Sequence, residues 1–281
     1  MANNQSISSK YFTFIESCHA WFKWWVFFLF YENGRNYIKK KHQEKPVAIL
    51  ANGPSLNKLD LLSVSNQDCC MVNYAPLSDL FFLVRPCYHV MVDDSFFIKS
   101  QEKLKSLLMQ VSWEMTVFIP YRFWKDALGQ YGGNPHLTFV PVHCTGLPDS
   151  FSFKKMAWRL FRKGKSLPIP QNVLIVAIYC MINSGYQSIN IYGADHTWIQ
   201  KIIVNEDNQV CKVDDHFYDG KSINEYIPLM LDSGSPSHLS HELRFQANAF
   251  AAYEMLQEYA VFEGVSIRNL TKGSFIDAFP R

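Results

Sequence analysis

The sequence predicts an α/β protein built on an open parallel sheet with helices on both faces. Two observations predict this fold class. Short apolar runs at 46–51, 69–73 and 89–94 each end in polar residues, which is typical of buried parallel strands. An apolar helix expected over 172–184 leads directly into a strand over 188–195, and this order of elements is one arm of a βαβ crossover.

Residues 1–44 are expected to form a polar tail and an aromatic helix over 11–41. The run from Trp21 to Tyr31 is rich in Trp and Phe but shorter than the ~20 apolar residues that a membrane-spanning helix needs. Aromatic residues beside the basic stretch from Arg35 to Lys41 are typical of a helix at a membrane interface. We therefore expect peripheral contact with the inner face of the cell membrane. The equally weighted alternative is a packing helix, in the core or between copies in a homo-oligomer.

Residues 45–281 are expected to form one Rossmann-like domain. Its basic stretch over 150–170 is interpreted as a mobile or partly helical connection, and the helix over 172–184 is expected to stop at Gly185. A polar region at about 199–237 is expected to form a lid, and an amphipathic helix is expected over 241–259. Strands are expected at 46–51, 69–73, 89–94, 117–120, 137–140, 188–195 and 266–270.

Composition and charge exclude several classes of protein. The 27 Lys and Arg residues nearly balance 25 Asp and Glu residues, so we expect no nucleic-acid partner. The seven cysteines are odd in number and include no Cys-x-x-Cys pair, which indicates neither a disulfide framework nor a zinc site. This cysteine usage favours a cytoplasmic location.

The turn Asn52-Gly53-Pro54-Ser55 follows the first expected strand and precedes a helical turn. Backbone N–H groups and a hydroxyl at such a place favour a phosphate. The turn matches neither the Walker sequence nor the dinucleotide-binding glycine pattern, so both of those ligand classes are disfavoured. Without other evidence, the better interpretation is a tight turn with Ser55 as a helix cap.

Polar residues also end the next two expected strands, with Asn73 after one and Asp93 and Asp94 after the other. Ligands of open parallel sheets bind outside these carboxyl ends. An amide suits a base or ribose edge, and a carboxylate suits sugar hydroxyls or a metal ion. The alternative is that all three side chains only cap loops.

Together these segments resemble bacterial CMP-sialic acid-dependent sialyltransferases. The resemblance includes 49–56, the strand ends just described, the helix and strand over 173–195, and the segment 237–241 before a helix. The ending over 267–281 is more similar to the related 6-hydroxymethylpterin diphosphokinase-like family, which shares the Gly-Pro-Ser-Leu turn. The resemblance covers roughly residues 46–281.

The sialyltransferase resemblance implies transfer of a sialic acid-like nonulosonic acid from a CMP-activated donor to a saccharide or glycolipid acceptor in surface glycan synthesis. It implies a histidine general base, placed on His241 or on His238, and needs no metal or other cofactor. Three places depart from the family pattern: Gln171-Asn172, Asp94 and His196-Thr197-Trp198. The expected donor-binding residues are Asn52, Gly53, Pro54, Ser55, Asn73, Asp93, Asp94, Asn172, Gly193, Asp195 and His196.

Two rival functions remain open at this point. A diphosphotransferase acting on a pterin-like alcohol would hold Mg²⁺ and ATP with Asp93, Asp94 and Asp195. A membrane-associated scaffold would keep the fold without turnover.

Overall fold

The computed structural model describes residues 18, 22, 38, 43–99, 101–212, 226–231 and 233–281. Apart from Cys18, Phe22 and Ile38, the aromatic helix expected over 11–41 lies outside these residues. Its predicted membrane or subunit contact therefore stays a prediction. Within the described part of the chain, no helix has both the length and the apolar character to span a membrane.

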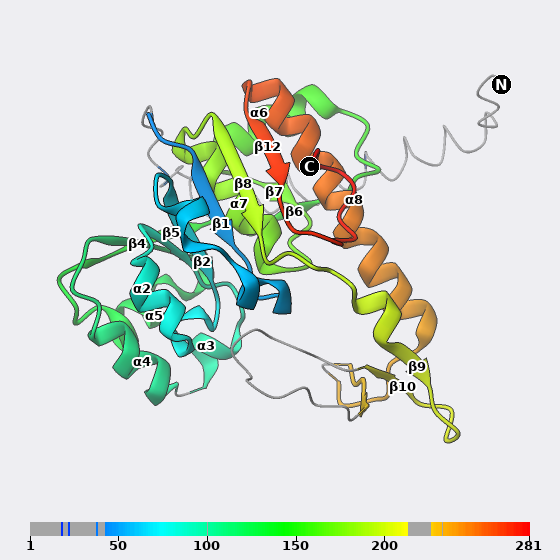
Figure 1. The fold of residues 1–281 in the computed structure, drawn as a ribbon. Helices are drawn as coiled ribbons and strands as arrows, with labels where there is room; N and C mark the ends of the chain where they lie inside the picture. Colours follow the sequence, from blue (N-terminus) through cyan, green and yellow to red (C-terminus); the bar gives the residue numbers. More distant parts are fainter. Residues whose placement is uncertain are drawn as a thin grey trace.

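A seven-stranded sheet forms the centre of the molecule, with strand order β12-β8-β1-β2-β3-β4-β5 (Figure 1). All neighbouring strands in it are parallel. The chain runs outward from β1 to β5, then returns to place β8 on the other side of β1. The strands are β1 (Val47–Leu50), β2 (Asp68–Val72), β3 (Tyr88–Val90), β4 (Met115–Pro120), β5 (Leu137–Val142), β8 (Ser188–Tyr192) and β12 (Ser266–Asn269).

Helices cover both faces of the sheet, which confirms the predicted fold class. Alternate residues of a strand point to opposite faces, so Val47 and Ile49 join one buried cluster while Ala48 and Leu50 join the other. The first cluster contains α6 (Lys154–Arg162), α7 (Val173–Ser184) and α8 (Leu239–Glu263). The second contains α2 (Asp79–Val84), α3 (Ser95–Ile98), α4 (Glu102–Met109) and α5 (Trp124–Tyr131).

Helix α7 begins and ends where the sequence predicts. Asn172 caps its first turn, because the Oδ1 atom accepts hydrogen bonds from Leu174 N and Ile175 N. Gly185 ends it with a φ of 100°, a left-handed conformation that glycine adopts without a steric penalty. Helix α8 is longer than the predicted 241–259. It ends before Gly264, which has the same left-handed conformation as Gly185.

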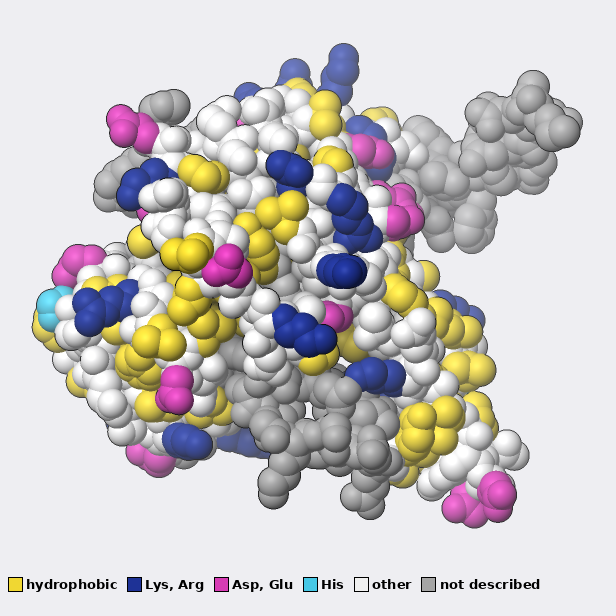
Figure 2. All heavy atoms as spheres, viewed as in Figure 1, with side chains coloured by type: hydrophobic (Ala, Val, Ile, Leu, Met, Phe, Trp, Pro, Cys, Tyr) yellow, Lys and Arg dark blue, Asp and Glu magenta, His cyan; other side chains and the backbone are white. Residues whose placement is uncertain are grey.

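The region predicted as a lid contains regular structure. After the short helix η5 (Trp198–Lys201), strands β9 (Ile202–Val204), β10 (Val210–Lys212) and β11 (Ile227–Pro228) form a small antiparallel sheet in the order β11-β10-β9. The predicted turn over 205–208 joins β9 to β10. Hydrophobic side chains gather at this projecting end in Figure 2, and Val204 is 48% exposed. A gating role for this region stays a prediction.

The sequence did not predict helices α2 to α5, which lie between the first five strands. Helix α6 occupies the basic stretch interpreted as a mobile or partly helical connection. The helical turn predicted after Gly53 is a 3₁₀ helix. The remaining short elements are η1 (Pro54–Lys58), η2 (Leu61–Val64), η3 (Ala75–Leu77), η4 (Tyr121–Phe123), β6 (Gly146–Leu147) and β7 (Leu167–Pro168).

Candidate functional site

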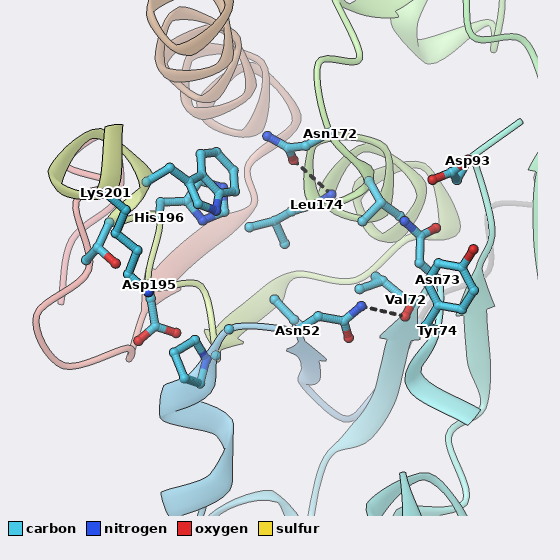
Figure 3. Close-up of a pocket in the computed structure, with 17 residues that line it drawn as sticks. Asn52, Val72, Asn73, Tyr74, Asp93, Asn172, Leu174, Asp195, His196 and Lys201 are labelled. Carbon is cyan, nitrogen blue, oxygen red and sulfur yellow. Dashed lines mark hydrogen bonds between the residues drawn. The ribbon is translucent and has the colours of Figure 1, made fainter. Parts of the chain in front are cut away.

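A pocket of about 280 Å³ opens at the carboxyl ends of β1, β2, β3 and β8. It lies where the chain reverses direction across the sheet, between β1 and β8, which is where ligands of open α/β sheets bind. Residues after these four strands, the first residues of α7 and helix η5 line it. Figure 3 shows Asn52 and Asn172 on opposite sides of the pocket, Asn73 and Asp93 on a third side, and His196 and Lys201 across from them.

The turn after β1 lies against the loop after β8. Gly53 N donates to Gly193 O at 2.7 Å. A Cβ atom on Gly53 would lie 2.0 Å from Asp195 Oδ2 and 2.4 Å from Gly193 O, so a side chain does not fit there. Gly193 has a φ of 69° and equally little room, since its Cβ would lie 2.8 Å from Ala51 O. The two glycines let the strand ends approach closely and form the pocket floor.

Ser55 is hydrogen-bonded to Asp195 in the loop after β8. Its Oγ donates to Asp195 Oδ2 at 2.7 Å and its N–H donates to the same oxygen at 3.3 Å. Ser55 is absent from the lining of the strand-end pocket and instead lines a second cavity, of about 650 Å³, on the other side of the turn. It also does not act as the helix cap, because the capping position is Gly53. Asp195 lines both cavities, and its carboxylate holds the turn in place.

Asn52 and Asn73 both line the pocket, as predicted from their positions after strands. Asn52 Nδ2 donates to Val72 O at 3.2 Å, while its buried Oδ1 has no partner among the described residues. Asn73 adopts a φ of 45°, a left-handed conformation that Asn tolerates better than most residues. Its Oδ1 accepts from Val92 N at 3.3 Å. A buried acceptor without a partner is costly, so Asn52 Oδ1 marks a place for a ligand donor.

The structure separates the two neighbouring aspartates. Asp93 lines the pocket, and its Oδ1 accepts from Ser95 N at 2.8 Å. Asp94 forms an ion pair with Arg122 and is not part of the pocket lining. Its predicted place near the donor sugar stays a prediction. The side chain of Asp94 is turned to a different strand end, because Arg122 follows β4.

Asn172, Tyr253 and His196 form a chain of hydrogen bonds beside the pocket. Tyr253 from α8 donates its hydroxyl to Asn172 Oδ1 at 3.0 Å and lies 2.6 Å from His196 Nε2. Burial lowers the pKa of His196 to about 3, so its ring is neutral at pH 7. The Nδ2 atom of Asn172 is buried and has no partner among the described residues.

Neither histidine proposed as the base lines this pocket. His238 is the residue before α8 and is exposed. The side chain of His241 is 56% exposed, and its Nδ1 lies 3.3 Å from Ser237 Oγ and 3.5 Å from Glu242 Oε1. The structure therefore brings together the predicted donor-binding residues Asn52, Gly53, Pro54, Asn73, Asp93, Asn172, Gly193, Asp195 and His196, and leaves His238, His241, Asp94 and Ser55 outside them.

Among the lining residues that were not predicted as site residues, Tyr74, Trp198 and Lys201 carry an aromatic or charged side chain. Tyr74 directly follows Asn73, so its place at a strand end was a usable signal in the sequence. The ring of Trp198 lies 4.1 Å from that of His196. Lys201 belongs to the region predicted as a lid, and nothing in its local sequence distinguished it from the other lysines of the chain.

The carboxylates named for the rival magnesium site do not gather into one cluster. Asp94 is paired with Arg122, and Asp195 is held by Ser55. Over the described ranges, no group of three or more His, Cys, Asp or Glu side chains is arranged to hold a metal ion.

No family model matches the chain, and no curated protein matches it. Among solved structures, the chain is similar to the sialyltransferase CstII from Campylobacter jejuni in complex with the substrate analogue CMP-3FNeuAc, at 15% identity, with a TM-score of 0.45, over 84% of this chain and 85% of that chain. It is also similar to the sialyltransferase CST-II in complex with a trisaccharide acceptor and CMP, at 14% identity, with a TM-score of 0.45, over 83% of this chain and 84% of that one. Likeness of this degree assigns no function, which must come from the chain's own residues.

Proposed function

We propose that this protein is a glycosyltransferase that binds a CMP-activated, sialic acid-like sugar in the strand-end pocket and transfers the sugar to a saccharide acceptor. The observation that carries the proposal is a pair of buried amide atoms in one pocket, Asn52 Oδ1 and Asn172 Nδ2, which have no hydrogen-bond partner in the part of the chain that the structure describes. A ligand that fills this pocket must supply a donor to the first atom and an acceptor to the second. A nucleotide sugar carries both kinds of group.

Two features of the pocket, the N-terminus of α7 and Lys201, favour an anionic group of the ligand beside them, while Asp93 and Asp195 also line the pocket. The first residues of α7 line it, and the N-terminus of a helix carries partial positive charge and favours phosphate. Lys201 lines the same pocket and adds a cationic side chain. Tyr74 and Trp198 add aromatic rings on which a base or a sugar ring can stack. The cytidine and the sugar class themselves come from the sequence resemblance over 46–281.

A base for the acceptor hydroxyl must come within hydrogen-bond reach of it in the complex. His241 is the sequence-based candidate but lies outside the pocket lining, whereas Asp93 is a carboxylate within it. Because catalytic contacts often tighten only when substrate binds, the two are best separated by pH–rate profiles of His241→Ala and Asp93→Asn. Loss of the ascending limb identifies the base, and profiles unchanged in both variants would remove both residues from that role.

Ligand-dependent melting tests the nucleotide class. The protein is heated with CMP, CDP, UDP, GDP or ATP, each with Mg²⁺ or with EDTA. CMP at 100 times its Kd would stabilise the native state by about 2.7 kcal/mol, a rise of several degrees in melting temperature. We expect the rise with CMP alone among the nucleotides, and equally with EDTA.

Two other outcomes would contradict the proposal. Stabilisation by ATP only in the presence of Mg²⁺ would support the diphosphotransferase instead. CMP binding without release of CMP from CMP-N-acetylneuraminic acid in the presence of saccharide acceptors would support a binding protein without turnover.

A further inference from the structure

Two hydrogen bonds join α7 to α8, and both pair a tyrosine hydroxyl with an asparagine oxygen. Tyr253 donates to Asn172 Oδ1 at 3.0 Å beside the pocket, and Tyr259 donates to Asn183 Oδ1 at 3.0 Å at the other end of α7. All four side chains come from the same two helices or their caps. Of these four residues only Asn172 lines the pocket. A change in the Tyr253–Asn172 pair can therefore affect ligand binding directly, whereas a change in the Tyr259–Asn183 pair cannot.

The orientation of the Asn172 amide follows from its neighbours. Leu174 N and Ile175 N lie 3.0 and 3.3 Å from the Oδ1 atom, and a backbone N–H only donates. The atom facing them must therefore be the oxygen, and the Tyr253 hydroxyl becomes its third donor. Figure 3 shows this oxygen toward Leu174 and the amide nitrogen on the other side of the group. Asn172 is thus left with two N–H donors and, among the described residues, no acceptor for them.

The same reasoning gives the tautomer of His196. A tyrosine hydroxyl has one proton, and Tyr253 uses it on Asn172 Oδ1, which cannot donate. At the 2.6 Å contact with His196 Nε2, the hydroxyl oxygen must therefore accept. His196 is then protonated at Nε2 while its buried ring stays neutral at pH 7.

We propose that Tyr253 is a positioning residue that, aligned by His196, holds the Asn172 side chain so that its Nδ2 donates to an anionic oxygen of the ligand. Tyr253 is absent from the pocket lining and contacts two residues that belong to it, so it acts through them. The orientation of Asn172 stands on these contacts alone. Naming the anionic oxygen as the phosphate of CMP rests on the proposed function.

A double-mutant cycle tests whether Tyr253 acts through Asn172. The variants are Tyr253→Phe, Asn172→Ser and their combination, with CMP affinity measured by titration calorimetry. Serine keeps an oxygen for the helix cap but has no amide donor. We expect Asn172→Ser to weaken CMP binding roughly 10- to 100-fold, as loss of a hydrogen bond to a charged group does, and Tyr253→Phe about fivefold. In the Asn172→Ser background, Tyr253→Phe should change affinity by less than twofold.

Tyr259→Phe is the matched control, because it removes the same type of hydrogen bond between the same helices away from the pocket. Both tyrosine variants should lower the melting temperature by a similar amount, while only Tyr253→Phe weakens CMP binding. An equal loss of affinity in both variants, or the same loss from Tyr253→Phe in both backgrounds, would show a structural role and overturn the proposal.

A measurement without ligand separates this proposal from the proposed function. Nitrogen-15 NMR of the His196 ring should show the Nε2-protonated form in the wild type and a mixture of tautomers in Tyr253→Phe. A ring protonated at Nδ1 would overturn the proposed alignment of Tyr253 by His196, since Tyr253 would then have to donate to His196. If the wild-type protein shows the expected tautomer but binds no CMP, the proposed function is contradicted, whereas the hydrogen bonds proposed between His196, Tyr253 and Asn172 are still supported.

Discussion

An asparagine at each end of α7 accepts a hydrogen bond from a tyrosine of α8, but the other hydrogen-bonding groups of the two asparagines differ. Asn183 receives Tyr259 on its Oδ1 and donates its Nδ2 to Tyr179 O at 3.2 Å, so both sides of its amide are used. Asn172 receives three donors on its Oδ1, and its Nδ2 has no partner within the described ranges. A buried amide with every group paired holds the fold together, whereas one with a donor left over is prepared for a ligand. Variants that change one end and not the other can break or sharpen this comparison.

The largest effect is expected at His89, a fully buried histidine outside the pocket. Burial lowers its pKa from 6.5 to about 4. Above pH 6.5 the ring is neutral in both the folded and the unfolded protein. As the pH falls from 6.5 to 4, only the unfolded state gains the proton, so stability is lost over that range. The full loss corresponds to about 3 kcal/mol at 1.36 kcal/mol per pKa unit.

His89→Leu should remove this loss, because leucine does not titrate. Denaturant unfolding at pH 7 and pH 4 measures the effect. The free energy of unfolding of the variant relative to the wild type should rise by about 3 kcal/mol between these two pH values. A pH-independent difference would show that His89 has the same pKa in the folded and the unfolded state, and would contradict this prediction.

The next largest effect is expected from replacing each asparagine by aspartate. In Asn172→Asp the cap survives, but a carboxylate oxygen takes the place of the unpartnered donor and repels an anionic ligand. We expect CMP affinity to fall about 100-fold, or close to 2.7 kcal/mol, with stability almost unchanged.

Asn183→Asp should do the reverse. Its new oxygen would face Tyr179 O in a buried place, which costs about 2 kcal/mol of unfolding free energy and leaves CMP affinity unchanged. Calorimetric titration and denaturant unfolding of both variants provide the comparison. Equal losses of CMP affinity in the two variants would refute the distinction between the Asn172 end of α7, which is prepared for a ligand, and the Asn183 end, which is not.

Gly53→Ala tests the pocket floor. The new Cβ would meet Asp195 Oδ2 and Gly193 O at distances that force the two loops apart, so we expect a loss of about 2 kcal/mol in unfolding free energy together with weaker CMP binding. Gly129→Ala in α5 is the control, since its Cβ would have no atom within 4 Å. It should stabilise the protein by roughly 0.5–1 kcal/mol. Wild-type stability in Gly53→Ala would mean that the loops are not closely packed.

The smallest effect is expected from Ser55→Ala. Removing the 2.7 Å hydrogen bond to Asp195 should cost about 1 kcal/mol, and Ser55 N still donates to the same carboxylate. Ser65→Ala, which removes an exposed bond to Leu62 O, should stay within about 0.5 kcal/mol of the wild type. A larger loss of CMP affinity than of stability in Ser55→Ala would support the predicted place of Ser55 in the ligand site.

The sequence predicted much of the fold because its strongest signals are local. The runs 46–51 and 188–195 contain β1 and β8, and Gly185 ends α7 as expected. Helices α2 to α5 were missed because they have only four to eight residues, too few for a clear helical periodicity. The sheet in the predicted lid was missed for a similar reason, since its strands have two or three residues.

By itself the sequence determined which side chains stand at the carboxyl ends of the strands, since a strand followed by a turn is local information. Asn52, Asn73 and Asp93 reach the pocket for this reason, and Asn172 reaches it as the cap of the predicted helix α7. Only the tertiary structure decided which polar groups remain available there. Asp94 pairs with Arg122 from another strand end, Ser55 pairs with Asp195, and Tyr253 reaches Asn172 across 81 residues. Such partners are chosen by packing between distant segments, and no local pattern records them.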